Sequence, residues 1–222
     1  MDYLNKLPKI EFILTLVCFI IIPCIPQVGV IGAFILVIAY IRRSKNRPLL
    51  LRSIGFSSPA NWLKVVGVSV VLGVAAELFA EIIFNPLIEK ITDTPIDLTK
   101  VDFHTNLLIY MGWVALGFIV GGLLEEVLFR GFLLTRVSKL FSSTTTGNLC
   151  GLIATSTIFG LCHLYQGWSG VVSTGFIGLI LGGILLAKNN LWYSILTHGF
   201  INLTGLTILY LNYYSTISTL VF

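Results

Sequence analysis

Charged side chains are scarce in this chain of 222 residues, because Asp, Glu, Lys and Arg together make up only 11% of it. An ordinary soluble domain contains about 25% charged residues. The mean hydropathy is +0.94, and apolar runs of roughly 17 to 25 residues recur along the chain. The basic residues form no patch interleaved with exposed aromatics, so a nucleic acid is not an expected partner. The composition predicts an all-α, polytopic transmembrane helical bundle in a lipid bilayer.

Cysteine is also scarce, and the pattern of the four cysteines argues against the usual cysteine-based sites. Cys18, Cys24, Cys150 and Cys162 lie in or beside apolar runs, without a CxxC pair or a metal-ligand spacing. We interpret them as small buried hydrophobic residues and expect no disulfide. The HExxH pattern, which places two zinc ligands and a base on one helix, is absent too.

Seven apolar segments are candidates for membrane spans. They cover residues 10–22, 28–41, 63–84, a run that begins near 107, 148–164, 170–187 and 191–211. The first two are short and are separated by Pro23 and Pro26, which favours two short or tilted spans joined by a tight turn. A single broken helix would reduce the count to six. A signal peptide is disfavoured, because no small-residue cleavage site follows the first run.

The distribution of charge predicts how the spans are oriented. Short loops rich in Lys and Arg face the cytoplasm, and the strongest basic cluster lies between the second and third spans: Arg42, Arg43, Lys45, Arg47 and Arg52. The connection at residues 85–106 is mainly acidic, contains His104 as an expected exposed histidine, and suits the other side. The turn between the fourth and fifth spans is then on the cytoplasmic side. So are three further basic residues: Arg136, Lys139 and Lys188. The amino terminus is predicted inside and the carboxyl terminus outside.

We divide the chain into two parts. Residues 1–104 hold the first spans and the basic cytoplasmic loop, and residues 105–213 hold the motifs that carry chemistry. Glu77 and Glu81 lie one helical turn apart late in the third span. These two carboxylates either approach the outer surface or line a polar cavity.

The stretch GGLLEEVLFRG, residues 121–131, places three ionisable groups in a run otherwise fit for lipid. A charged side chain at the centre of a membrane helix costs about 2.5 kcal/mol or more. Glu126 and Arg130 are four residues apart, share a helical face and can pair. Glu125 points elsewhere and has no partner in its own helix. We interpret Glu126 as a carboxylate held ionised by Arg130, and Glu125 as the one available for proton transfer.

The turn at residues 142–147 predicts the depth of Glu125. Glu125 and His163 are equally far from residue 144, so in an antiparallel helix pair both would lie about 28 Å from the turn. The fourth and fifth helices are then expected to extend beyond the bilayer. Phe159 lies one turn before His163 on the same face and is expected to pack near it.

His198 and Asn202 are one turn apart on the last span, and both can donate hydrogen bonds into a cavity, as an oxyanion requires. His198 lies about 10 Å along its helix from Asn189, which is shallower than the depth of His163. Either this helix starts below the membrane surface or the loop after His163 dips inward. The glycine pairs 117/121 and 178/182 allow close approach of helix backbones, which is a structural signal.

Three motifs in order, EEVLFR at 125–130, FGLCH at 159–163 and HGFIN at 198–202, resemble the CPBP family of intramembrane proteases. This family includes the CAAX prenyl endopeptidases and the bacterial Abi proteins linked to bacteriocin self-immunity. The resemblance covers roughly residues 105–210. It implies that Glu125 activates water with the help of His163, and that His198 and Asn202 stabilise the oxyanion. It implies supporting roles for Glu126 and Arg130. We count Phe159 as a third supporting residue, because it is expected to pack near His163.

Several alternatives stay open at this stage. Two carboxylates and two histidines could bind zinc, but Asn202 is an unusual zinc ligand and Arg130 disfavours a dication, so no metal or other cofactor is expected. The expected partners are the bilayer and a peptide or membrane-protein substrate, prenylated at a CAAX tail or of a bacterial type. A non-catalytic bacteriocin-immunity or scaffold protein is one rival, and a proton-coupled transporter is another. The chain is expected in the cytoplasmic membrane of a prokaryote.

Overall fold

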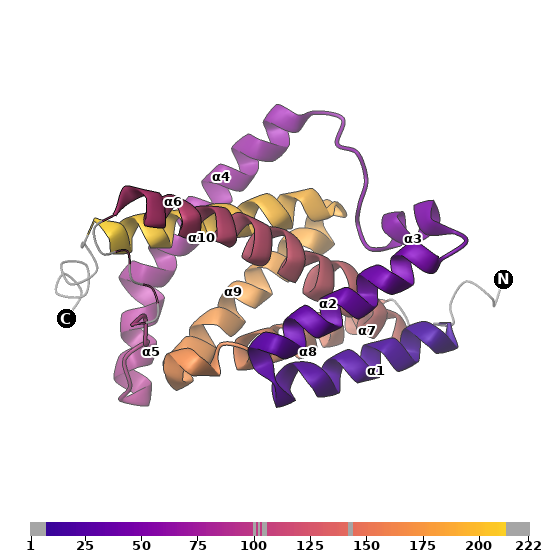
Figure 1. Ribbon diagram of the computed structural model, residues 1–222, viewed down its shortest axis with the longest axis horizontal. Helices are drawn as coiled ribbons and strands as arrows, with labels where there is room; N and C mark the ends of the chain where they lie inside the picture. The colour runs from indigo at the N-terminus through magenta and orange to yellow at the C-terminus, as the bar shows by residue number, and fades with distance from the viewer. Residues whose placement is uncertain (1–7, 100, 102, 104–105, 142–143, 212–222) are drawn as a thin grey trace.

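The protein is a bundle of helices that cross one another (Figure 1). The computed structural model describes residues 8–99, 101, 103, 106–141 and 144–211, and every regular element in these ranges is helical. The predicted all-α class is therefore confirmed. By length and composition, three helices of the described ranges are able to cross a membrane: Trp62–Thr92, Leu107–Leu140 and Leu164–Lys188. The total of seven spans stays a prediction, as does the division at residues 104 and 213, which lie outside the described ranges.

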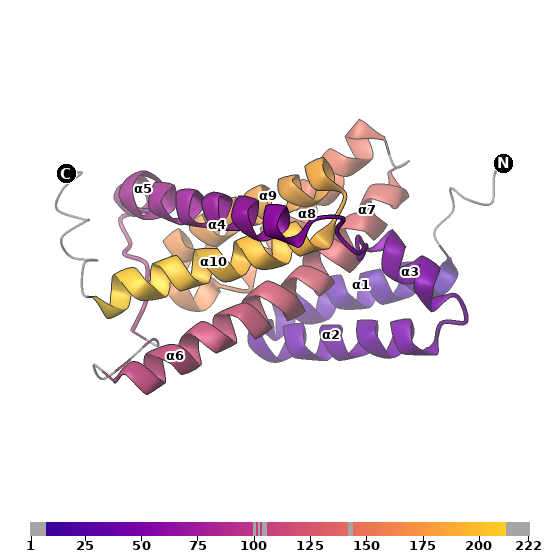
Figure 2. The same cartoon turned by 90° about the horizontal axis from the view of Figure 1, so that it is seen from above.

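The two short N-terminal runs form two separate helices rather than one broken helix. Helix α1 spans Lys9–Cys24 and α2 spans Pro26–Arg43, with Ile25 alone between them. Pro26 is the first residue of α2, where its fixed φ and missing N–H are tolerated. The two helices lie side by side as a hairpin in both views (Figures 1 and 2).

The basic segment after α2 is partly helical, whereas the charge pattern predicted a basic cytoplasmic loop. Helix α3 spans Arg47–Ser53 and buries Leu50. Ile54 follows with no exposed surface, and Gly55 adopts φ +89°, a left-handed conformation that favours glycine. The Gly55 carbonyl accepts a hydrogen bond from the Leu191 backbone N–H over 2.9 Å. This segment therefore covers the start of the last helix.

The third span continues past its predicted end at residue 84. Helix α4, Trp62–Phe79, runs through a π-helical turn, Ala80–Phe84, into α5, Asn85–Thr92. Pro86 has no N–H and its ring displaces the carbonyl of the preceding turn, so a wider turn just before it lets the helix continue. The helix ends at Asp93, which has φ 51°. The predicted acidic connection therefore starts at residue 93 rather than 85, and its His104 lies outside the described residues.

One long helix of 34 residues carries the acidic motif. Its parts are α6, Leu107–Leu116; the π-helical segments Gly117–Glu125 and Val127–Leu134; and α7, Thr135–Leu140. Figure 2 shows it crossing the molecule from the α6 end to the α7 end. At 1.5 Å per residue its length is about 50 Å, which exceeds the roughly 30 Å of a hydrocarbon core. This agrees with the prediction for the fourth helix.

Three further helices complete the bundle. Helix α8 spans Thr145–Leu161, α9 spans Gly167–Lys188 and α10 spans Leu191–Tyr210, with a 3₁₀ turn at Leu164–Gln166 before α9. The 17 residues of α8 extend only about 26 Å. This is shorter than the roughly 30 Å of a hydrocarbon core, so the prediction that the fifth helix exceeds the bilayer is wrong. His163 lies just beyond the last turn of α8 rather than inside the helix.

A buried ion pair joins the N-terminal hairpin to the long helix. Arg136 Nε donates to Glu11 Oε2 over 3.1 Å, and both side chains are almost fully buried. The Tyr40 hydroxyl also donates to Glu11, and Arg136 donates to the hydroxyls of Ser53 and Thr135. The sequence suggested a cytoplasmic basic residue at position 136. The structure makes Arg136 an anchor that ties residues of the first half of the chain to the second, and its cytoplasmic placement stays a prediction.

Candidate active site

A cavity of about 420 Å³ lies between the long helix, α4 and α10. It collects the four residues that were predicted to carry the chemistry: Glu125, His163, His198 and Asn202. They come from three different helices or their ends, and they are separated by up to 77 positions, from Glu125 to Asn202. A second cavity of about 170 Å³ shares His163, His198 and Asn202 and adjoins Phe159. The fold thus brings the three motifs to one polar space.

Glu126 is the centre of a buried cluster of three ionisable groups. Its Oε1 accepts from Arg130 Nη1 over 2.7 Å, four residues along the same helix. The same oxygen accepts from His198 Nδ1 over 2.8 Å. Glu126 has no exposed surface, and its Oε2 and Arg130 Nη2 have no hydrogen-bond partner among the described residues. The predicted intrahelical pair is present, and the contact with His198 was not foreseen.

Phe159 organises the aromatic side of the site. The guanidinium of Arg130 lies 4.1 Å from the centre of the Phe159 ring. The same ring meets His163 edge-on at 5.1 Å and His198 at 5.9 Å between centroids. A cation over an aromatic face is attracted by the ring quadrupole. Phe159 therefore packs against three polar side chains at once, which includes the predicted contact with His163.

The imidazole of His163 is held by the end of its own helix. The Phe159 carbonyl is in the last turn of α8, where backbone oxygens lose their regular partners. The His163 backbone N–H bonds the Gly160 carbonyl instead, so the Phe159 oxygen is available for His163 Nδ1, at 2.9 Å. Because a carbonyl only accepts, Nδ1 carries the proton. The remaining nitrogen, Nε2, is the one left for the cavity.

Asn202 and His198 approach the long helix through its glycines. Asn202 Nδ2 donates to the Gly117 carbonyl over 2.9 Å, where the π-helical segment begins. A Cβ atom on Gly121 would collide with the Asn202 amide and stand 3.3 Å from His198 Nε2. A Cβ on Gly117 would stand 2.9 Å from the Asn202 Cβ. The glycine pair 117/121 thus has the structural role predicted for it, and it brings α10 against the motif.

The depth of His198 follows from where α10 begins. Leu191, the first residue of α10, has no exposed surface, and Asn190 is 9% exposed. Both lie beneath the segment after α3, whose Gly55 and Ser57 carbonyls accept from Leu191 N and Asn190 Nδ2. Helix α10 therefore begins inside the fold. This buried start explains the reach of His198 to Glu126, whereas the position of the helix start relative to the membrane surface stays a prediction.

Glu125 is placed differently from its neighbour. It is half-buried, whereas Glu126 is fully buried, and it lines the cavity beside His163 and Tyr165. Its carboxylate lies close enough to His163 and Arg130 to interact electrostatically with both. The two neighbouring carboxylates are therefore placed differently, as predicted: Glu126 is paired with Arg130, and Glu125 lines the cavity. The catalytic roles of these residues stay predictions.

The cavity has polar walls that the motifs did not indicate. Glu77 and Glu81 line it from the third span, which decides between the two alternatives stated for them. Tyr165 and Gln166 line it from the turn before α9, and the Tyr165 ring lies 5.7 Å from His163. The sequence offered one indication that Tyr165 and Gln166 lie at the site, which is their position directly after the FGLCH motif. Their placement depends on a 3₁₀ turn, which the sequence pattern did not predict.

The donor set of the site does not fit a metal ion. Zinc sites use at least three protein ligands in most enzymes. Within the described ranges, no group of three or more His, Cys, Asp or Glu side chains is arranged to hold a metal. Arg130 also lies against the carboxylate that a dication would need. We therefore derive no step through a metal, and a mechanism without one stays a prediction.

Long apolar helices around a buried Glu–Arg–His cluster define an integral membrane protein with a polar cavity inside its helical bundle. Residues 107–204 match the family model described as Type II CAAX prenyl endopeptidase Rce1-like. This segment of the chain is similar to that family, in agreement with the resemblance to CPBP proteases, and the match supports the general class of protease. Searches of curated proteins and of solved structures gave no match.

Proposed function

We propose that the protein is an intramembrane endopeptidase that hydrolyses a peptide bond in a membrane-associated or prenylated CAAX-type substrate. One observation carries the proposal: Glu125, His163, His198 and Asn202 line the same cavity beside the buried Glu126–Arg130 pair. A carboxylate base, an imidazole and two hydrogen-bond donors are the groups that attack by water on a carbonyl requires.

The first step is attack by water. Glu125 takes a proton from a water molecule in the cavity, and the water oxygen forms a bond to the scissile carbonyl carbon. His163 Nε2 accepts a hydrogen bond from the same water, because its Nδ1 proton is engaged by the Phe159 carbonyl. A base fixed by a second group keeps the lone pair directed at the reacting atom.

The carbonyl oxygen becomes negatively charged as the water attacks. The second N–H of the Asn202 amide donates to this oxygen while the first holds the Gly117 carbonyl. His198 Nδ1 is engaged by the Glu126 carboxylate, so Nε2 is the ring nitrogen left to donate to this oxygen when it carries a proton. Donors held in place before the reaction need no reorganisation, and removal of one such donor costs about 100- to 1,000-fold in rate.

The tetrahedral intermediate then collapses. The bond between the carbonyl carbon and the amide nitrogen breaks, and the proton held by Glu125 passes to the leaving amine. The products are a carboxylic acid and an amine, between which a proton then passes to give a carboxylate and an ammonium group, and Glu125 returns to its starting carboxylate. Glu125 thus acts first as a base and then as an acid, so the proposed steps use only side chains of the protein and water.

The walls of the cavity suit a substrate that is partly apolar. Leu98, Val101, Trp113, Leu116, Val120, Leu206 and Leu209 line it together with the polar residues. Leu116 is 51% exposed, so this wall continues to the surface of the bundle. An apolar or prenylated segment is favoured there over a strongly charged one. The proposed location is the cytoplasmic membrane of a prokaryote, within which the charge distribution supports only the orientation of the spans.

The test is cleavage of a lipid-anchored reporter peptide by the purified full chain in liposomes. We expect the Glu125→Gln and His163→Ala variants each to lose about 100-fold or more of kcat/KM. Lys188→Gln, which alters an exposed residue at the end of α9, serves as the matched control and is expected to cleave normally. If both cavity variants retain full cleavage, the proposed function is wrong. Retained bacteriocin protection by Glu125→Gln would favour a binding role instead.

A further inference from the structure

The smaller of the two cavities at the site, of about 170 Å³, extends past the side chains of the proposed mechanism to a wall that the mechanism does not use. Glu77 and Glu81 line both this cavity and the larger one. Beyond them lie Asn85, Ser173 and Thr174, which line the smaller cavity but not the larger one. The volume is below the roughly 300 Å³ at which pockets for drug-sized ligands begin. It suits one side chain of a substrate rather than a longer segment.

A chain of hydrogen bonds orients the carboxylate of Glu81 in this wall. Glu81 lies in the π-helical turn Ala80–Phe84, a conformation that is frequent at functional sites. Asn85 Nδ2 donates to Glu81 Oε1 over 3.2 Å, and Ser173 Oγ of α9 donates to Asn85 Oδ1 over 2.6 Å. Asn85 is only 5% exposed. Glu81 is therefore held by a buried amide that is itself held from a second helix, as side chains of a preorganised binding site are.

The carboxylate of Glu77 is seated against α10. A Cβ on Gly205 would collide with it, so a glycine at this position is what admits the carboxylate beside the cavity. Of the four carboxylate oxygens of Glu77 and Glu81, only Oε1 of Glu81 accepts a hydrogen bond within the described part of the chain. A carboxylate in an apolar helical bundle costs free energy unless a cation or several donors satisfy it. The remaining oxygens are thus placed to accept from a ligand.

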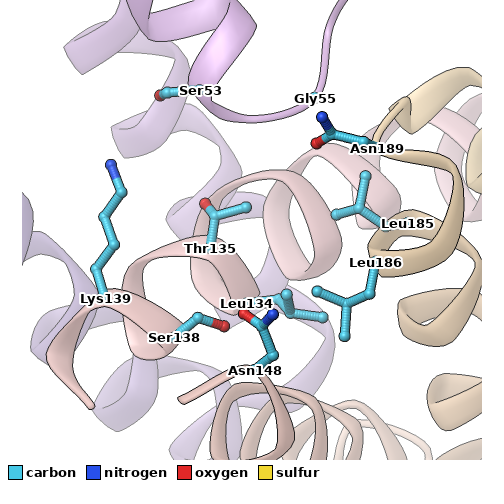
Figure 3. A pocket seen from close by; sticks show the side chains of 10 residues that line it. All are labelled: Ser53, Gly55, Leu134, Thr135, Ser138, Lys139, Asn148, Leu185, Leu186 and Asn189. Carbon is cyan, nitrogen blue, oxygen red and sulfur yellow. The ribbon is translucent and has the colours of Figure 1, made fainter. Parts of the chain in front are cut away.

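The walls of the two cavities carry carboxylates without a lysine or arginine to balance them. Glu77 and Glu81 are close enough to repel each other, and Glu125 lines the larger cavity with them. None of the residues described as lining either cavity is Lys or Arg. By contrast, a pocket of about 270 Å³ at the other end of the long helix has Lys139 in its wall, and none of the ten residues that Figure 3 labels there is acidic. A cationic group between Glu77 and Glu81 relieves their repulsion and donates charge-assisted hydrogen bonds to them.

We propose that the smaller cavity is a specificity pocket for one basic side chain of the substrate, a lysine or an arginine, with Glu77 and Glu81 as its acceptors. The apolar stem of that side chain lies along wall residues such as Ile177. Because His163 and His198 line both cavities, the basic residue is one that flanks the scissile bond. The apolar wall of the larger cavity takes the neighbouring residues.

This inference deepens the proposed function and rests on it in taking the occupant to be a peptide. It selects between the substrate classes named above. A membrane-associated peptide with a basic residue at its cleavage site is favoured over a CAAX tail whose residues there are aliphatic, because only the first supplies a cation to the two carboxylates.

The test uses the purified full chain in liposomes and lipid-anchored reporter peptides that carry Lys or Gln at a residue flanking the cleaved bond. We expect the parent to cleave the Lys peptide with a kcat/KM about tenfold or more above that of the Gln peptide. In the Glu77→Gln/Glu81→Gln double variant this ratio is expected to fall below about twofold, through slower cleavage of the Lys peptide. Glu89→Gln removes a carboxylate of the same helix that lines neither cavity, and it is expected to keep the ratio of the parent. A parent that cleaves both peptides equally overturns the inference.

A binding measurement separates this inference from the proposed function. The Glu125→Gln variant is used to measure the affinities of the same two peptides by fluorescence anisotropy in detergent, without cleavage. We expect the Lys peptide to bind about tenfold more tightly, and the difference to disappear when Glu77→Gln and Glu81→Gln are added. If the parent cleaves neither peptide but this preference is present, the proposed function is wrong and the specificity pocket stands. Equal affinities for the two peptides overturn the specificity pocket, even where the parent cleaves both.

Thermal unfolding checks that the variants fold. A glutamine at position 81 keeps an oxygen that accepts from Asn85, and the double variant removes two charges that repel each other. We therefore expect it to unfold at the temperature of the parent or higher. The Glu77→Gln single variant is measured beside it, and its preference for the Lys peptide is expected to fall to a value between those of the parent and the double variant. A folded single and double variant that both keep the full preference would show that these carboxylates do not select the substrate.

Discussion

The imidazole of His198 donates from Nδ1 to Oε1 of Glu126 over 2.8 Å, although the two residues are 72 positions apart. The same oxygen receives the Arg130 guanidinium. One buried carboxylate thereby holds a cation of its own helix and a histidine of α10 in fixed positions. Glu126 is best described as a positioning residue, because it directs His198 toward the cavity without lining that cavity itself.

The Glu126–Arg130 pair is expected to be important for stability as well as for cleavage. Glu126→Gln removes the carboxylate paired with the buried Arg130 and leaves only the Glu125 carboxylate nearby, so we expect the free energy of unfolding to fall by about 3–5 kcal/mol. The Glu126→Gln/Arg130→Met double variant removes both charges and is expected to recover much of this loss. Denaturant unfolding in detergent measures the stability, and the reporter peptide measures cleavage.

Cleavage by the double variant separates positioning from mere stability. We expect it to stay about 100-fold below the parent, because the neutral amide that replaces the Glu126 carboxylate is a weaker acceptor and orients His198 less firmly. A double variant that is both stable and fully active would show that the Glu126–His198 contact has no part in catalysis.

The Gly121→Ala substitution is expected to reduce the rate of cleavage more strongly than the free energy of unfolding. A Cβ at this position would collide with the Asn202 amide, and a displacement of about 1 Å in a reacting group can cost 100-fold in rate. Gly112→Ala is the matched control, since a Cβ there has nothing within 4 Å. Replacing that helical glycine is expected to leave kcat unchanged and to stabilise the helix by about 0.5–1 kcal/mol. Equal kcat values for the two variants would contradict the close approach of Asn202.

The Glu11–Arg136 pair is expected to hold the N-terminal hairpin on the bundle. Glu11→Gln leaves Arg136 buried without its carboxylate, and we expect a loss of about 3 kcal/mol in the free energy of unfolding. Lys9→Gln, an exposed change two residues away on α1, is expected to alter stability by less than about 0.5 kcal/mol. Limited proteolysis of the hairpin gives a second readout. Resistance to protease that matches the parent in Glu11→Gln would count against this anchor.

Metal removal is expected to leave cleavage intact. The described side chains provide no group of three metal ligands, and the proposed steps use only side chains of the chain and water. The measurement is reporter cleavage after exhaustive chelation, with elemental analysis of the same sample. Cleavage that disappears on chelation and returns with added zinc would show that the metal-free mechanism is wrong.

Local spacing was sufficient to predict part of this protein. Residues four apart on a helix share a face, so the Glu126–Arg130 pair and the contact of Phe159 with His163 could be expected without coordinates. Long apolar runs predicted helices, and the equal distance of Glu125 and His163 from one turn predicted a shared depth. These inferences hold because each depends on the geometry of one helix or one hairpin.

Contacts between distant helices were decided by packing alone. The Glu126–His198 and Glu11–Arg136 pairs join residues 72 and 125 positions apart. The first depends on α10 beginning inside the fold and on glycines that admit Asn202, and the second depends on how the N-terminal hairpin docks. The sequence by itself determined which residues carry charge in an apolar chain and which share a helical face. The tertiary structure decided which charges meet, because that depends on the crossing and depth of helices that no local period encodes.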